Sequence, residues 1–332
     1  MATPRREART QSQIERRIQR LAETRARRAP SLLVTVFGDA IAPHGGVVWI
    51  GSLIRLLEPL GPGSRVTRTA MQRLASGGWL TAKPVGRRSN YALSETGRRW
   101  VADAERRIYA GTPPGWDGRF WLLLLAPAGL SAERRDRVRR ELAWHGFGEL
   151  SPQVLVHPTP ALPELRHALE DLGLARRTVL LRAGEEELFG RSAEERRRIR
   201  HRWVSSAWDL AELAAAYRGF LARYEGFVAA VERTCPAPAW SFALRTLLIH
   251  DWRRVLLRDP ELPTELLPND WPGSRARGLC RALYQRIEEP ARRHLQAVLE
   301  TAEGPLPEPD PAYFRRFGGL ALRPPGRRAP RA

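Results

Sequence analysis

The sequence predicts an α+β multidomain protein: an N-terminal winged helix-turn-helix, a central ferredoxin-like (βαββαβ) domain and a C-terminal all-helical domain. Three observations predict this order. Residues 31–99 show three short helices of apolar pattern, followed by two strands that a basic turn joins. Residues 116–184 alternate short apolar runs with amphipathic ones. From residue 185 onward, apolar residues recur at the helical spacing of three and four.

The composition is that of a soluble protein with more than one domain. The chain has 332 residues, 43% of them hydrophobic, and no apolar run approaches the ~18 residues of a membrane helix. Its charged N-terminus lacks the apolar segment of a secretory signal. We therefore expect a cytoplasmic protein, associated with a bacterial nucleoid, without membrane contact. The two cysteines lie far apart and the seven histidines form no HxH or HExxH pattern, so we expect no metal and no cofactor.

The net charge favours a polyanionic partner. Basic residues number 55 against 36 acidic ones, which gives +19 at pH 7, and Lys83 is the only lysine. A field this positive favours DNA, RNA or an anionic membrane; the alternative is a basic protein without such a partner. Residues 1–29 carry nine arginines and three glutamates, a net charge of +6. Ile14, Ile18 and Leu21 fall at helical spacing but make only a thin apolar stripe. We expect a flexible basic arm with at most a transient helix, which samples DNA phosphates, with a solvated tail as the alternative.

Residues 30–110 form the predicted winged helix-turn-helix domain. An apolar helix over residues 31–42 would lie in its core, and Val47–Trp49 reads as a short strand. Residues 51–60 place leucine and isoleucine on one face of a second helix. A Gly-Pro-Gly turn then leads into a third helix over residues 65–76.

The third helix is the candidate for DNA recognition. Val66, Ala70 and Leu74 are expected to face inward. The residues left for the outside are Arg65, Thr67, Arg68, Thr69, Gln72 and Arg73. Arginine pairs bidentately with guanine and glutamine with adenine in the major groove, so these side chains suit base recognition. The alternative is a solvated basic face.

Two strands follow the third helix, over residues 79–85 and 89–93, with a basic hairpin tip between them. A wing of this kind contacts phosphates or the minor groove. The residues expected to do so are Lys83, Arg87, Arg88 and Asn90. Helix and wing together predict double-stranded DNA as the partner.

Residues 116–184 are predicted to form the ferredoxin-like domain. Its elements are expected over residues 119–126, 131–145, 147–150, 154–157, 163–172 and 177–182. Their order, β-α-β-β-α-β, is that of a ferredoxin-like module, and because sheets of this kind often pair across a two-fold axis we expect a homodimer. Residues 185–303 are then predicted as a helical effector domain, and the proline-rich residues 304–332 as a disordered tail.

Several stretches, taken in order, resemble one known family. They are SLLVTVFGDAIAPHGGVVWIGSLIRLL (31–57), VTRTAMQRLASGGWL (66–80), GRRSNYALSETGRR (86–99), RRIY (106–109), WDGRFWLLLL (116–125) and LLIHDWRRVLLRDPELPTELLPNDWPG (247–273). Over residues 30–300 the chain resembles the PaaX family of transcriptional repressors. The resemblance implies the domain order given above, repression of the genes for phenylacetic acid breakdown, and release from operator DNA by phenylacetyl-coenzyme A.

An acyl-coenzyme A effector requires arginines for its phosphates and an apolar or aromatic slot for its acyl group. We expect these groups in the C-terminal region, at Trp240, Arg245, Trp252, Arg253, Arg254, Arg258 and Trp271. The alternative for any one of these aromatic residues is a place in the core.

Two other functions stay open. The first is a metal-dependent nucleic-acid-processing enzyme with an accessory winged domain, which requires clustered carboxylates. The central domain resembles in topology the small nuclease of CRISPR adaptation, which has an acidic ligand at the end of its first strand. Here residues 125–127 offer no carboxylate and Asp117 precedes the strand, so we predict that the chain is not an enzyme. The second is a regulator of the same family that responds to a different acyl-coenzyme A.

Overall fold

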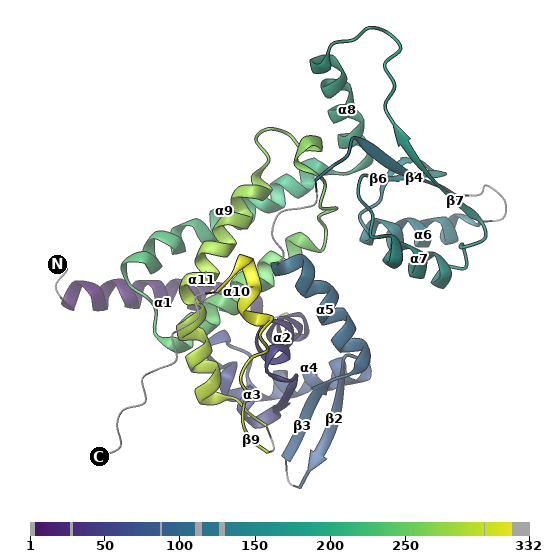
Figure 1. Ribbon diagram of the computed structural model, residues 1–332. Helices are drawn as coiled ribbons and strands as arrows, with labels where there is room; N and C mark the ends of the chain where they lie inside the picture. The colour runs from purple at the N-terminus through teal and green to yellow at the C-terminus, as the bar shows by residue number, and fades with distance from the viewer. Residues whose placement is uncertain are drawn as a thin grey trace. The chain divides into compact units, whose positions relative to one another are not determined.

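The computed structural model describes residues 4–26, 29–86, 88–109, 115–125, 130–301 and 303–320 (Figure 1). The chain divides into two compact units. The first comprises residues 1–111, 220–253 and 276–332, and the second comprises residues 112–219 and 254–275. The first unit therefore combines the region predicted as an N-terminal domain with a large part of the predicted C-terminal helices.

The N-terminal part of the first unit consists of helices and a three-stranded sheet. Its elements are α2 (Ala29–Val36), η1 (Phe37–Ile41), η2 (Ala42–His44), β1 (Val47–Trp49), α3 (Ile50–Leu56), η3 (Glu58–Leu60), α4 (Ser64–Ser76), β2 (Leu80–Val85), β3 (Arg88–Leu93) and α5 (Glu95–Tyr109). The strands are antiparallel in the order β1-β3-β2, with Val48 opposite Tyr91. The predicted helices and strands are present, except that the first helix is shorter: α2 ends at Val36 and the π-helical η1 continues it.

The N-terminal residues form a packed helix, so the flexible arm predicted over residues 1–29 is wrong for residues 4–26. Helix α1 (Pro4–Ala26) buries Ile14 and Ile18, with 2% and 0% of each exposed. It packs against α2 and η3. The Arg25 guanidinium donates to both carboxylate oxygens of Asp251, at 2.9 and 3.1 Å. The thin apolar stripe is sufficient for packing because distant parts of the first unit supply these polar partners.

The C-terminal part of the chain adds long helices and, up to residue 320, several short elements. Its elements are α9 (Leu210–Arg233), α10 (Pro238–Leu256), α11 (Pro272–Val298), β8 (Glu300–Thr301), β9 (Gly304–Pro305) and η5 (Tyr313–Gly318). The disordered tail predicted from residue 304 is wrong for residues 304–320, because Tyr313, Arg316 and Phe317 are buried. The backbone N–H of Asp310 also donates to the carbonyl of Pro43 at 2.8 Å.

One buried carboxylate, that of Asp39 in η1, gathers side chains from four other elements. Its oxygens lie 2.9 Å from Nε of Arg245 on α10 and 3.3 Å from Nη1 of Arg316 in η5. The hydroxyls of Tyr109 on α5 and Tyr284 on α11 donate to it at 2.6 and 3.0 Å. Burial raises the pKa of both phenols well above their usual value, so both keep the proton that they donate. The network joins N-terminal and C-terminal elements of the first unit.

The second unit is built on a four-stranded antiparallel sheet. Its elements are β4 (Arg119–Leu125), α6 (Ala132–Trp144), β5 (Gly148–Ser151), β6 (Val154–His157), α7 (Leu162–Asp171), β7 (Thr178–Gly184) and α8 (Ala193–Ala207). The strand order is β5-β6-β4-β7, so the two strands that begin and end this stretch of chain, β4 and β7, are neighbours. Before α8 the chain order is β-α-β-β-α-β, as expected.

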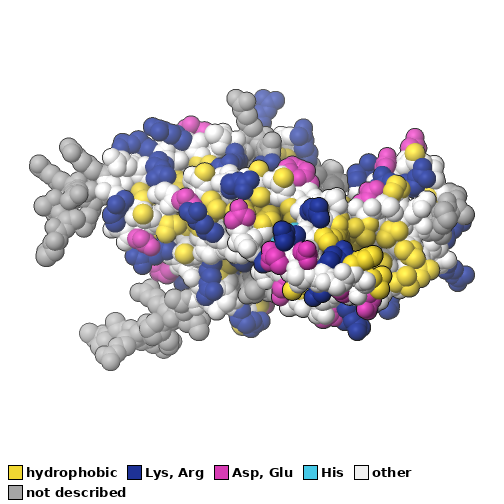
Figure 2. All heavy atoms as spheres, turned by 90° about the horizontal axis from the view of Figure 1, so that it is seen from above, with side chains coloured by type: hydrophobic (Ala, Val, Ile, Leu, Met, Phe, Trp, Pro, Cys, Tyr) yellow, Lys and Arg dark blue, Asp and Glu magenta, His cyan; other side chains and the backbone are white. Residues whose placement is uncertain are grey.

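The two faces of this sheet differ. On one face Leu123 and Leu125 of β4 pack with Val138 and Leu142 of α6. On the other face α8 and residues 262–267 cover Phe120 and Val156. Val179 and Leu181 of β7 stay 54% and 45% exposed, beside Leu124 and Leu122 of β4. Figure 2 shows hydrophobic side chains gathered at the right of the view, where the sheet lies.

We expect Asp39→Asn to lower the free energy of unfolding of the first unit by about 3–5 kcal/mol, because the buried guanidinium of Arg245 would lose its carboxylate, whereas Arg316 would keep Glu105 at 2.7 Å. The matched control is Asp103→Asn on α5, whose 63% exposed carboxylate forms a surface ion pair with Arg106. That control is expected to cost less than about 1 kcal/mol. Urea denaturation followed by circular dichroism measures both, and equal midpoints would contradict a structural role for Asp39.

Ile18→Ala tests the packing of α1. We expect the substitution to cost about 2–5 kcal/mol, because the side chain is fully buried and its removal leaves a cavity. Gln19→Ala, one position along on the exposed face, is the control. The measurement is thermal denaturation, and a mobile N-terminal arm would instead give the same melting temperature for both variants.

Candidate nucleic-acid interface

Helix α4 presents one basic face to solvent. Thr67, Ala70, Met71 and Leu74 are buried at helical spacing. The side chains left outside are Arg65, Val66, Arg68, Thr69, Gln72 and Arg73. The helix begins after Gly63, and β2 packs against it, so α4 and the β2–β3 hairpin are neighbours (Figure 1). A helix of 13 residues presents a surface suited to the major groove.

The charges of this face are not neutralised by the protein. The guanidiniums of Arg65, Arg68 and Arg73 form no ion pair within the described residues. The hydroxyl of Thr69 donates to the carbonyl of Arg65 at 3.0 Å, so it is satisfied within the helix. Three uncompensated positive charges beside the amide of Gln72 form a surface that attracts phosphates and can read base edges.

The β2–β3 hairpin holds its basic side chain in place by stacking. The guanidinium of Arg88 lies 4.4 Å from the ring centre of Trp49, and that of Arg55 lies 5.3 Å from it. The carboxylate of Glu300 lies 4.0 Å from Arg88 and 3.3 Å from Arg55. A Cβ at Gly51 would meet the Trp49 ring at 2.4 Å, so this stack requires glycine there. Arg88 is therefore oriented while its side chain stays 49% exposed.

Two of the predicted DNA contacts are wrong, because their side chains are buried. Thr67 is fully buried on the inner side of α4, whereas Val66, predicted to face inward, is 49% exposed. Asn90 is 4% exposed, in the middle strand of the sheet. Lys83 and Arg88 are exposed as predicted. Arg87 lies outside the described residues.

Trp49 and Glu300 support this surface but were not predicted. Trp49 precedes Gly51 by two residues, and this spacing was the signal available in the sequence. Glu300 gave no such signal, because it lies 245 residues along the chain from the Arg55 that it contacts.

The structure does not assemble the predicted effector residues into one cluster within a unit. Trp240, Arg245, Trp252 and Arg253 belong to the first unit, whereas Arg254, Arg258 and Trp271 belong to the second. Arg245 and Trp252 are fully buried. The former pairs with Asp39, and the indole of the latter donates to the carbonyl of Ile108 at 3.2 Å. Both side chains are therefore engaged within the protein, and neither is exposed to a ligand in this structure.

Three of the remaining predicted effector residues have protein partners too. The guanidinium of Arg253 donates to the carbonyl of Ser31 at 3.2 Å. Arg258 pairs with Glu212 on the surface. Trp271 packs edge-on against Tyr217, with 5.8 Å between ring centres. These contacts explain their positions without a ligand.

Acidic residues of the second unit show the same pattern of pairing. Asp117 accepts from the backbone N–H of Arg119 at 3.0 Å and pairs with Arg182. These hydrogen bonds lower the pKa of Asp117.

Within the described ranges, no three His, Cys, Asp or Glu side chains gather closely enough to hold a metal ion. None of the described helices is both long and apolar enough to span a membrane.

The fold and this surface define a class: a helix-rich α+β protein that presents a basic helix and an adjacent hairpin to a polyanion. Three family descriptions match in order along the chain. Residues 28–97 match "PaaX-like protein", residues 113–202 match "PaaX protein central Cas2-like domain", and residues 208–297 match "PaaX-like protein C-terminal domain". The chain belongs to the PaaX family.

Two individual proteins are similar over most of the chain. Transcriptional repressor PaaX of Escherichia coli (strain K12) is 39% identical over 294 residues, which cover 88% of this chain and 90% of that protein. The solved structure of uncharacterized protein Rv0674 from Mycobacterium tuberculosis is 25% identical, with a TM-score of 0.52, and the match covers 79% of this chain and 98% of that one. The fold class thus includes a Cas2-like central domain followed by a helical C-terminal region.

We expect Arg68→Ala and Arg73→Ala each to weaken binding to a DNA sequence selected by the wild-type protein by about 1–3 kcal/mol, if the side chain reads a base. Arg88→Ala should instead weaken binding to all sequences and reduce the salt dependence. Arg293→Ala, on the exposed side of α11 and paired with Glu289, is the control. Mobility-shift titrations at two salt concentrations measure these effects, and unchanged affinity in all three variants would contradict the assignment of the surface.

Proposed function

We propose that this protein is a DNA-binding repressor of genes for phenylacetate degradation, released from its operator by an aryl-coenzyme A such as phenylacetyl-coenzyme A. The observation that carries the proposal is the exposed face of α4, whose three arginines have no carboxylate partner in the described residues. The similarity to a transcriptional repressor over 88% of the chain also supports a role as a repressor. A regulator, rather than an enzyme, is therefore the function proposed.

In this proposal α2, α3 and α4 with the β2–β3 hairpin act as a winged helix-turn-helix. Helix α4 enters the major groove, where Arg68, Gln72 and Arg73 meet base edges. Lys83 and Arg88 of the hairpin contact the phosphates beside it. The antiparallel order β1-β3-β2 supports this assignment, because it leaves the β2–β3 hairpin to extend from the edge of the sheet.

The four-stranded sheet of the second unit is proposed as a ferredoxin-like domain that joins two copies of the chain. The strand order β5-β6-β4-β7, flanked by α6 and α7 on one face, supports the fold assignment. The exposed Val179 and Leu181 on the other face support a role in association, since exposed apolar patches mark contact surfaces. A two-fold dimer would present two α4 helices to the two halves of a palindromic operator.

Effector control follows from differential binding. A ligand that binds better to a conformation unable to hold DNA shifts the population away from the operator, with a coupling that is typically ~1–3 kcal/mol. The ligand proposed is an aryl-coenzyme A, with phenylacetyl-coenzyme A named by the family resemblance. A related acyl-coenzyme A is the alternative within the same mechanism.

The test is a mobility-shift assay on the control region of phenylacetate-degradation genes. We expect the protein to bind this DNA and to be released by phenylacetyl-coenzyme A, at concentrations where acetyl-coenzyme A and free phenylacetate have no effect. Release of the protein from this DNA by acetyl-coenzyme A but not by phenylacetyl-coenzyme A would show that the effector is a different acyl-coenzyme A. Binding that no acyl-coenzyme A alters would remove effector control and leave a simple DNA-binding protein.

A further inference from the structure

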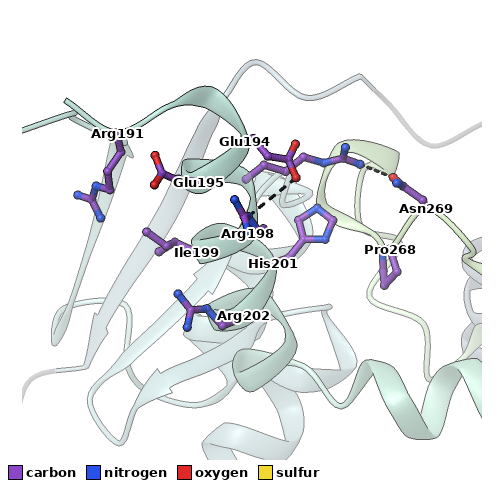
Figure 3. A pocket seen from close by; sticks show the side chains of 10 residues that line it. Arg191, Glu194, Glu195, Arg198, Ile199, His201, Arg202, Pro268 and Asn269 are labelled. Carbon is purple, nitrogen blue, oxygen red and sulfur yellow. Dashed lines mark hydrogen bonds and ion pairs between the residues drawn. The ribbon is translucent and has the colours of Figure 1, made fainter. Parts of the chain in front are cut away.

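A basic hollow lies along α8 in the second unit, beside the loop residues Pro268 and Asn269 (Figure 3). Its volume is ≈ 770 Å³, within the range of sites that hold nucleotide-sized ligands. None of the predicted effector residues lines it. Arginines dominate the lining: Arg191, Arg197, Arg198 and Arg202 come from α8 and the residues before it.

The two carboxylates of the hollow do not neutralise these arginines. Glu195 accepts from the backbone N–H of Ser192 at 2.8 Å, as half of the capping box that begins α8. This hydrogen bond lowers the pKa of Glu195. The negative charge of Glu195 therefore stabilises the N-terminus of α8. Glu194 lies 3.9 Å from Arg198, and both side chains are 68% exposed, so their attraction is weak.

Two of the arginines keep a full, uncompensated charge. Arg197 donates to the side-chain oxygen of Asn269, which is an uncharged acceptor (Figure 3). Arg202 has no hydrogen bond or ion pair with any residue that the structure describes. Guanidinium groups in this state bind phosphate oxygens through charge-assisted, bidentate hydrogen bonds.

The hollow also offers groups that a phosphate alone would not use. Nε2 of His201 is shielded from solvent and lacks a hydrogen-bond partner among the described residues. Such an atom is costly to leave unpaired, so a polar ligand atom there would be stabilising. Ile199 and Pro268 add apolar surface beside the arginines. The lining therefore matches a ligand with both a ring or apolar part and several phosphates.

We propose that this hollow binds a small ligand that carries at least two phosphate groups next to a nucleoside. The proposal rests on the proposed function, in which that ligand is the nucleotide half of the acyl-coenzyme A effector. It places the phosphate contacts on α8 rather than on the arginines of α10.

Isothermal titration of the full chain, free of DNA, tests the proposal with coenzyme A, ADP and inorganic phosphate as probes. The test variant is R197Q/R202Q, which removes two exposed charges. The matched control is R135Q/R140Q, which removes two exposed arginines from α6 of the same unit. We expect coenzyme A and ADP to bind the wild type and the control alike, and the test variant to lose at least about tenfold in affinity for both.

Three results would overturn the proposal. They are equal affinity of R197Q/R202Q and the control for coenzyme A, inorganic phosphate binding as tightly as coenzyme A (an adventitious ion only), and weaker DNA binding by R197Q/R202Q than by the control in the absence of ligand. The last result would assign the hollow to the DNA backbone.

Release from the operator separates this proposal from the proposed function. If phenylacetyl-coenzyme A releases the wild type and R197Q/R202Q at the same concentration, the hollow is not the effector site, while effector control stands. If no acyl-coenzyme A affects DNA binding but ADP and coenzyme A still bind through Arg197 and Arg202, the hollow stands as a nucleotide site and the proposed effector fails.

Discussion

The first unit depends on a single buried carboxylate. A charge as deeply buried as that of Asp39 is tolerated only when oppositely charged and hydrogen-bonding groups surround it. Arg245 and Arg316 supply the charges, while Tyr109 and Tyr284 supply protons that burial keeps in place. These groups come from α5, α10, α11 and η5. The burial of Asp39 in η1 therefore requires that α10, α11 and η5, which lie far along the chain, are folded against it.

The contacts of Asp39 also affect how helix α4 is held in place. Helix α2 packs directly against α4, and η1 with Asp39 continues α2 without a break. A displacement of α10 that separates Arg245 from Asp39 would leave the buried guanidinium of Arg245 without its carboxylate, at a cost of several kcal/mol, while Asp39 would keep Arg316. Helices α10 and α4 are therefore linked within the first unit by a continuous series of contacts that runs through Asp39 and α2.

The local sequence pattern predicted many of the helices and strands. It did not predict the parts of the fold that depend on contacts between residues far apart in the sequence. The strands Val47–Trp49 and Val154–His157 were predicted to the residue, because short apolar runs between turns are a local signal. The residues on the exposed face of α4 were predicted correctly except for Thr67, which is buried, and Val66, which is exposed. The packing of helix α1 and the order of residues 304–320 were not predicted, since Ile18 and Arg316 are buried by partners distant in sequence; Arg316 lies 277 residues from Asp39.

The same reasoning explains why the effector residues could not be chosen from the sequence. In a chain whose basic residues are nearly all arginine, residue type does not separate a structural arginine from a binding one. What separates them is whether a carboxylate lies within reach, and that depends on tertiary structure. Arg245 has Asp39 and Arg258 has Glu212, so their charges are used within the protein. Arg68, Arg73 and Arg202 have no such partner among the described residues, so their charge is available to an anion. Uncompensated arginine, rather than arginine itself, is what the exposed face of α4 and the hollow on α8 have in common.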